Sequence, residues 1–165
     1  PGNHDVDGVY YDSARRDVFN IMNHKNLKEK KFPLKISSDK SFFIIGDSNS
    51  RENQLKEIYS IIKKNLSYKN IFVIMHHVYP ESLSFAANAP GKHGYFKDSF
   101  FIEELKKIDL ENIIFIYGDG GAFKKLPRIA CKKLFNSTHI VNGIGEIKGD
   151  IVLIVNNGEI YSIEI

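Results

Sequence analysis

The chain contains three short, almost unbroken apolar runs, each followed by a glycine or a polar residue. They occupy positions 41–45, 71–75 and 113–117. Apolar runs of this length, bounded by turn residues, are typical of strands that are buried on both faces. We therefore predict three buried strands. Alternating apolar residues at 32–36 predict a further, half-buried strand before them.

Apolar residues at helical spacing separate these runs. The segment 12–24 follows the N-cap candidate Asp12, and a second helix is predicted between 55 and 66. A third is predicted to begin near Asp98, with one apolar face that reaches Ile108. Strand and helix therefore alternate along the first three quarters of the chain. This order predicts an α/β layered domain.

The last part of the chain consists of short β runs at 129–134, 139–141, 151–155 and 160–165. The dipeptide Asn157-Gly158 between the last two is a strong signal for a two-residue hairpin. We expect antiparallel C-terminal strands to complete the sheet. Because the chain shows no internal repeat and no clear linker, we interpret residues 1–165 as a single domain.

Composition narrows the possible functions. The chain has 42% hydrophobic residues and a formal net charge of +3, values typical of a globular protein. The densest lysine run, at 28–31, lacks the interleaved aromatic residues of a nucleic-acid platform. Cys131 is the sole cysteine, which excludes an internal disulfide and a cysteine-based zinc site. No apolar run reaches the length of a membrane span.

Polar clusters follow glycine-rich turns or buried strands at three places: Asn3-His4-Asp5, His76-His77 and 118–121. Amide oxygen, imidazole and carboxylate can bind a divalent cation or move a proton. In open α/β sheets, ligands gather at the carboxyl ends of the strands, where the second and third clusters are expected. Each cluster also has a plainer interpretation, as a polar turn or as a structural histidine at a strand end.

The pentapeptide Pro1-Gly2-Asn3-His4-Asp5 resembles the GNH(D/E) signature of the calcineurin-like metallophosphoesterases. The strand at 72–75 followed by His76-His77 resembles another motif of that family. Residues 41–48, the helix that begins near Gln54, and the turn at 142–145 are also similar to parts of the family's pattern. The resemblance extends over nearly the whole chain, and its most specific part is the GNHD sequence.

This resemblance implies a fold of two packed sheets flanked by helices, an α/β/β/α sandwich, and a centre of two divalent ions (Mn, Fe or Zn). Asn3 and His76 would bind the second metal, and His4 would be the acid that protonates the leaving oxygen. His77, beside His76, would be a weaker candidate for the same metal-binding role, and Asp5 would support the metal ligands without binding the metal itself. Metal ions in such a centre activate a water and neutralise phosphate charge.

The chain departs from the family pattern in two ways. The family's Asp-x-His and Gly-Asp-x-x-Asp motifs would precede Pro1, so we expect this chain to be the C-terminal part of a longer domain, without its first strands and helices. The family's final Gly-His-x-His reads Gly-Asp-Gly-Gly at 118–121. Asp119 could replace the first histidine as an oxygen ligand, or the segment could be a simple tight turn.

The segment 79–97 shows no sustained period and contains two prolines and two glycines. Long irregular segments in compact domains are often functional. His93, with Lys92 before it, could bind a substrate phosphate or assist a proton transfer. The alternative is a solvent-exposed lid whose polar residues have no role in chemistry.

The leading hypothesis is that this chain is the larger, C-terminal part of a metal-dependent phosphoesterase, incomplete by itself, which hydrolyses a phosphomonoester or a phosphodiester. The alternative is a degenerate phosphoesterase fold that serves as a binding or scaffold module, as the Gly-Asp-Gly-Gly sequence suggests. A nucleotide-binding domain ranks last, because 118–121 matches no Gly-rich phosphate-binding motif. Loss of N-terminal strands would expose a sheet edge, so we expect this chain to self-associate or to be less stable than a longer parent.

Overall fold

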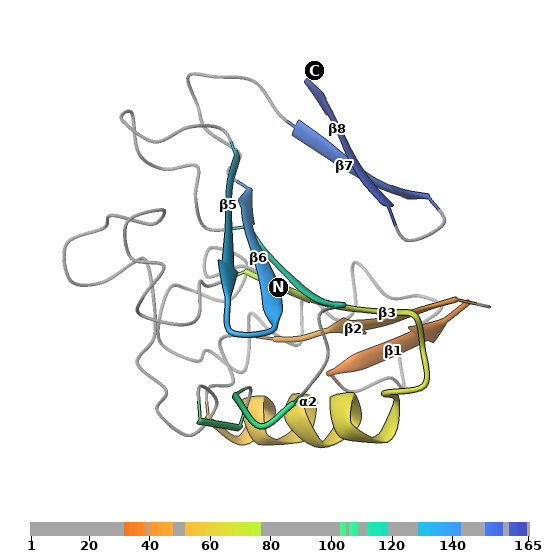
Figure 1. Ribbon diagram of the computed structural model, residues 1–165, viewed down its shortest axis with the longest axis vertical. Helices are drawn as coiled ribbons and strands as arrows, with labels where there is room; N and C mark the ends of the chain where they lie inside the picture. Colours follow the sequence, from red (N-terminus) through yellow and green to blue (C-terminus); the bar gives the residue numbers. More distant parts are fainter. Residues whose placement is uncertain are drawn as a thin grey trace, which may run out of the picture.

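The computed structural model describes residues 32–38, 40–47, 52–76, 103–104, 106–108, 112–118, 129–142, 151–156 and 159–164. These residues form a six-stranded mixed sheet, a separate two-stranded sheet and a helix, α2 (Glu52–Lys64), along one face of the larger sheet (Figure 1). The α/β class is therefore confirmed for this part of the chain. The helix predicted at 12–24 lies outside the described residues.

The larger sheet has the strand order β1-β2-β3-β4-β6-β5. Its neighbours β2, β3, β4 and β6 are parallel, and the outer strands β1 and β5 run antiparallel to the strands beside them. The bounds are β1 (Leu34–Ser37), β2 (Ser41–Ile45), β3 (Asn70–Met75), β4 (Ile113–Tyr117), β5 (Ile129–Leu134) and β6 (Ser137–Asn142). The three buried strands predicted from apolar runs are β2, β3 and β4.

Helix α2 forms because apolar residues recur on one side of it and can be buried against the sheet. Ile58 and Ile62 are fully buried, and Leu55 is 3% exposed. Lys63 and Lys64 occupy the last turn, where positive charge is favoured by the helix dipole. The helix therefore covers the central strands from one side and holds them in a common layer.

The alternation of side chains along the parallel strands divides the core into two parts. Ile71, Val73 and Met75 of β3 belong to the larger cluster on the α2 side. Phe72 belongs to a second cluster on the opposite face, with Ile114 and Ile140 as its other buried members. Both faces of the central strands are thus buried, which explains their nearly continuous apolar sequence.

The C-terminal strands differ from expectation. The prediction that antiparallel C-terminal strands complete the sheet is correct for β5, but β6 is parallel to β4, and the strands at 151–156 and 159–164 form a sheet of their own. Next in the chain after β4 is the outer strand β5. A turn at 135–136 then leads into β6, which lies between β4 and β5 (Figure 1).

The last two strands, β7 (Ile151–Asn156) and β8 (Glu159–Glu164), form the separate antiparallel pair. Asn156 pairs with Glu159, which leaves a two-residue connection and confirms the predicted hairpin. Ile160 of β8 packs against the second core cluster, on the face of the larger sheet that lies opposite α2. The structure thus shows helix α2 and a β-hairpin on opposite sides of the sheet (Figure 1).

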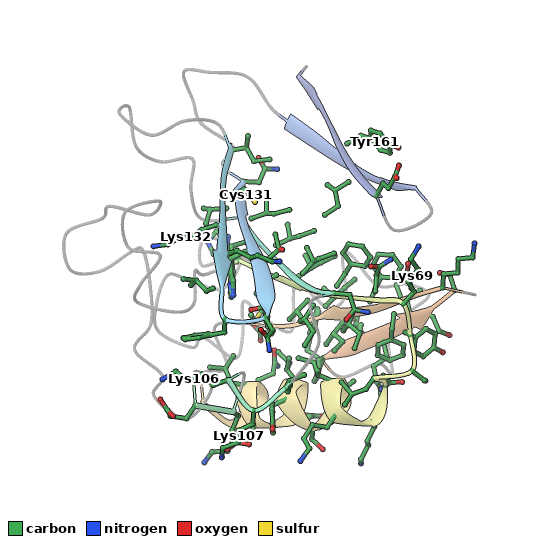
Figure 2. All side chains as sticks on the ribbon, in the orientation of Figure 1. Lys69, Lys106, Lys107, Cys131, Lys132 and Tyr161 are labelled. Carbon is green, nitrogen blue, oxygen red and sulfur yellow. The ribbon has the colours of Figure 1, made fainter. Side chains whose placement is uncertain are left out.

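The segment that precedes β4 is attached to α2 by polar contacts. Tyr59 of α2 donates a hydrogen bond to the Glu104 carboxylate, and Lys107 also donates to Glu104. These two donors, Lys107 first, lower the pKa of Glu104. Asn136 Nδ2 donates to the carbonyl of Ile108 at 3.0 Å. Lys106 and Lys107 lie beside α2 (Figure 2).

Candidate functional site

Four parallel strands end at the same edge of the larger sheet, and the residues that follow them form the candidate site. Ile45 is the register partner of Ile74, Met75 is the partner of Tyr117, and Tyr117 is the partner of Val141. Continuing each register by one or two positions gives one row of residues across the sheet. We call it the edge row: Asp47, His76, Gly118 and Asn142.

The edge row belongs to the face of the sheet that lies away from α2. Phe43, Phe72 and Ile114 lie on that face, in β2, β3 and β4. Asp47, His76 and Gly118 come four residues after Phe43, Phe72 and Ile114, respectively. Because side chains along a strand alternate between faces with a period of two, this spacing continues the same face. Residues that are distant in sequence thus meet at one edge and on one face.

Gly46 fixes the path of the chain into the edge row. Its N–H donates to the carbonyl of Ile74 at 2.9 Å, which continues the parallel ladder by one residue. A Cβ at this position would lie 2.9 Å from Ile58 Cδ1 and 3.0 Å from Met75 Cγ. A side chain at this position would therefore require Ile58 and Met75 to shift in the core beneath the turn.

Asp47 is fully buried, with 0% of its surface exposed. Its backbone N–H donates to Oε1 of Gln54, a residue in the first turns of α2 that is itself 7% exposed. The backbone of Asp47 is therefore held by a buried side chain from a neighbouring element. A carboxylate in such a place needs compensating charge or hydrogen-bond donors, because its desolvation is costly.

His76 directly follows β3 and is half-buried. The N–H of Gly118 is shared between the carbonyls of Met75 and His76, each at 3.1 Å, so the ends of β3 and β4 are joined at this point. A Cβ built on Gly118 would lie 3.6 Å from Nδ1 of His76. The imidazole therefore stands next to an exposed glycine on one side and next to the strand that carries Asp47 on the other.

A buried polar chain lies on the α2 side of the sheet, directly before the edge row. Tyr117 Oη is 3.0 Å from His139 Nδ1, and His139 Nε2 is 2.8 Å from Ser137 Oγ. The Ser137 hydroxyl donates to the carbonyl of Leu134 at 3.0 Å, so it accepts from Nε2–H, and Nδ1 accepts from Tyr117. The His139 ring also stacks on Phe115, with centroids 4.7 Å apart. His139 is fully buried, so we assign it a structural role.

Of the residues predicted for the site, the structure describes His76. It places this histidine at the carboxyl end of a buried central strand, where the sequence indicated it. The remaining predicted residues lie outside the described part of the chain: Asn3, His4, Asp5, His77, His93 and Asp119. Their positions and roles therefore stay predictions.

The donor types in the edge row fit a divalent cation. The imidazole of His76 and the carboxylate of Asp47 are of the nitrogen and oxygen types that suit Mn, Fe or Zn, whereas Asn142 lies two strands away from His76 in the sheet. Within the described ranges, no group of three His, Cys, Asp or Glu side chains is close enough to hold a metal ion. Those ranges likewise contain no helix with the length and apolar content needed to cross a bilayer.

Sequence reasoning did not identify Asp47 and Asn142 as site residues. Asp47 follows a buried strand and a glycine, which is the same signal that identified His76. A single glycine followed by an aspartate is also typical of an ordinary turn, however, and the complete burial of Asp47 is known only from the structure. Asn142 was missed because the pairing of β6 with β4 could not be predicted.

Comparisons with protein-family models, with curated proteins and with solved structures gave no match.

Proposed function

We propose that this protein is a metal-dependent phosphoesterase, which hydrolyses a phosphomonoester or a phosphodiester with a metal-activated water. The observation that carries the proposal is the position of His76. It stands half-buried at the carboxyl end of a buried parallel strand, in one row with a buried carboxylate. This edge is where α/β sheets bind their ligands.

The sequence supports the same proposal independently. The GNHD tetrapeptide and the strand followed by His76-His77 resemble two motifs of the calcineurin-like metallophosphoesterases. We propose the finer architecture of that family as well, a sandwich of two sheets flanked by helices. In that arrangement β7 and β8 would belong to the second sheet, since Ile160 already packs against the face of the larger sheet opposite α2.

The proposed roles follow the chemistry of each group. Asn3, His76 and Asp119 would bind divalent metal ions, which supply the nucleophile by lowering the pKa of a bound water. His4 would give a proton to the leaving oxygen. Asp5 would orient a ligand, and His77 and His93 would contact the substrate phosphate. The rigid attachment of His76 to β3 keeps one ligand in place before a cation binds.

The proposal is tested with the full-length gene product, loaded with Mn²⁺ and assayed on p-nitrophenyl phosphate and on bis(p-nitrophenyl) phosphate. His4→Ala is expected to lower kcat by about 100-fold or more, as for the loss of a general acid. His76→Ala is expected to lower metal content and kcat/KM together, by at least about tenfold. His24→Ala, in the predicted helix 12–24, is the matched control and should leave both unchanged.

One observation favours a second candidate, a phosphoesterase fold kept as a non-catalytic binding module. Gly121 stands where the resemblance would require a second histidine, and glycine offers no ligand. Absence of hydrolysis of both esters by the metal-loaded, folded protein would favour this candidate. Hydrolysis that depends on His4 would exclude it.

A further inference from the structure

We propose that one buried water molecule binds between the side chains of Asn70 and Asn112, at the edge of the larger sheet where its parallel strands begin. This edge lies opposite the edge row. The water site is a separate feature of the molecule and does not depend on the proposed phosphoesterase activity.

Two complementary side-chain atoms are buried at this place. Asn70 is 8% exposed, and its Nδ2, a hydrogen-bond donor, has no acceptor among the described residues. Oδ1 of Asn112, an acceptor, is also buried and has no donor in the same part of the chain. Leaving such groups unpaired is costly, and native proteins pair nearly all of them with protein atoms or with ordered water.

Strand register places the two asparagines side by side. Ile71 pairs with Ile113, and the N–H of Ile71 donates to the carbonyl of Asn112 at 3.0 Å. Asn70 and Asn112 therefore come directly before paired residues of β3 and β4, on strands that lie about 4.8 Å apart. A water with hydrogen bonds of about 2.9 Å on each side can bridge groups separated by up to about 6 Å.

The Asn112 amide is held in one orientation. Its Nδ2 donates to the carbonyl of Tyr68 at 3.3 Å and to that of Lys69, in the segment that leads into β3. Flipping the amide would lose both hydrogen bonds and place Oδ1 against two carbonyl oxygens. Oδ1 is therefore kept as an acceptor beside Asn70.

Water is the ligand that suits this pair, because one molecule can accept from Asn70 Nδ2 and donate to Asn112 Oδ1 at the same time. A cation would be repelled by the amide donor, and an anion by the amide oxygen. The bridge would join the starts of two central strands through their side chains, in addition to the backbone bond between Ile71 and Asn112.

The first test records nuclear Overhauser contacts between solvent protons and side-chain amides of the unmodified protein. The Nδ2 protons of Asn70 and Asn112 are expected to show contacts with the sign of a long-lived, bound water. Those of Asn65, whose Nδ2 donates to the Ile61 carbonyl at 2.7 Å, should show none of that sign. Absence of the water contact at Asn70, or a direct contact between the two amides in its place, would overturn the inference.

The second test uses Asn70→Leu, which removes the donor and leaves no polar group to hold the water. If the water is bound, Asn112 Oδ1 loses its partner. The unfolding equilibrium constant should then rise about fivefold or more, and the water contact at Asn112 should disappear. If no water is bound, the substitution removes a donor that was already unpaired. The constant should then fall, and that result would refute the site.

Asn136→Leu is the matched control. It removes an amide at the same edge of the sheet, whose Nδ2 donates to the carbonyl of Ile108 at 3.0 Å. The water contacts of Asn70 and Asn112 should therefore stay unchanged in this variant. Their loss would show that they do not report a water held between these two side chains. If Asn70→Leu does not fold, the measurement on the unmodified protein decides.

Discussion

Gly46 is packed so closely that a methyl group in place of one hydrogen would meet two core side chains. The added Cβ would lie within 3.0 Å of both Ile58 and Met75, which pack in the core between α2 and β3 and would have to shift. We predict that Gly46→Ala lowers the free energy of unfolding by about 1–3 kcal/mol, the usual cost of overpacking. Urea denaturation followed by circular dichroism measures this.

Gly118 provides the control for this prediction. A Cβ there would meet His76 Nδ1 at 3.6 Å, an ordinary van der Waals distance. Gly118→Ala should therefore change the free energy of unfolding by less than about 0.5 kcal/mol. Equal destabilisation by the two substitutions would show that the tight contact at Gly46 is not the cause.

The buried chain from Tyr117 to Ser137 gives a second prediction at this scale. Tyr117→Phe removes the donor to His139 Nδ1 in a part of the core that has no exposed surface. An acceptor that loses its buried partner costs about 1–3 kcal/mol, so we expect a loss of this size in the free energy of unfolding. Tyr161→Phe removes a hydroxyl that bonds to Glu159 on the surface and should cost less than about 0.5 kcal/mol.

At the scale of elements, Tyr59 links α2 to the segment that precedes β4. Burial first, and then the Glu104 carboxylate, raises the pKa of Tyr59 from 10.0 to about 12. The folded state thus holds the phenol proton more tightly than the unfolded chain. The resulting stabilisation is complete below pH 10 and is lost as the pH rises from about 10 to about 12.

We therefore predict that the free energy of unfolding of the natural sequence falls more steeply over this alkaline range than that of Tyr59→Phe. Denaturant titrations at intervals between pH 8 and pH 12 measure the difference. Phenolate absorbance gives a direct check, since Tyr59→Phe should remove one late-ionising phenol that the natural sequence has. Parallel stability profiles for the two proteins would contradict the assignment.

The sequence predicted the elements better than their arrangement. The apolar runs at 41–45 and 113–117 have the same bounds as β2 and β4, because burial on both faces favours a nearly continuous apolar sequence. The place of β6 between β4 and β5 could not be predicted in the same way. Only Ile140 and Val141 among its six residues are apolar, and they do not specify which strand β6 pairs with.

The residues of the candidate site also differ in how well the sequence predicted them. His76 was predictable because a polar residue directly after a buried strand is held at the sheet edge. Asp47 carries the same kind of signal, but its importance depends on burial by elements that are distant in the sequence. Spacing in the sequence identifies residues that are close along the chain. The members of the edge row are close because their strands pair, and this pairing cannot be predicted from spacing.

At the scale of the whole molecule, the hairpin of β7 and β8 contacts the larger sheet through Ile160. We predict that Ile160→Ala lowers the free energy of unfolding by about 1–2 kcal/mol, less than for a fully buried isoleucine, because the side chain is half-buried. Tyr161→Ala alters the next residue of the same strand, which is 49% exposed. It should have a smaller effect in the same denaturation experiment.

An equal and small effect of both substitutions would show that the hairpin contributes nothing to the stability of the larger sheet. A larger effect of Ile160→Ala would show that the two sheets unfold together. The experiment therefore also bears on the proposed sandwich of two sheets, in which such a contact would be one of many.

The edge row draws its members from positions 47, 76, 118 and 142, so it exists only when four separate strands have paired. An unfolded chain has no equivalent of it. Any cation bound there is released on unfolding, and mass action then makes occupancy and folding a single coupled equilibrium. At a free concentration of about 100 times Kd, the ion would add about 2.7 kcal/mol to the free energy of unfolding. The melting temperature would then follow the metal content of the surroundings.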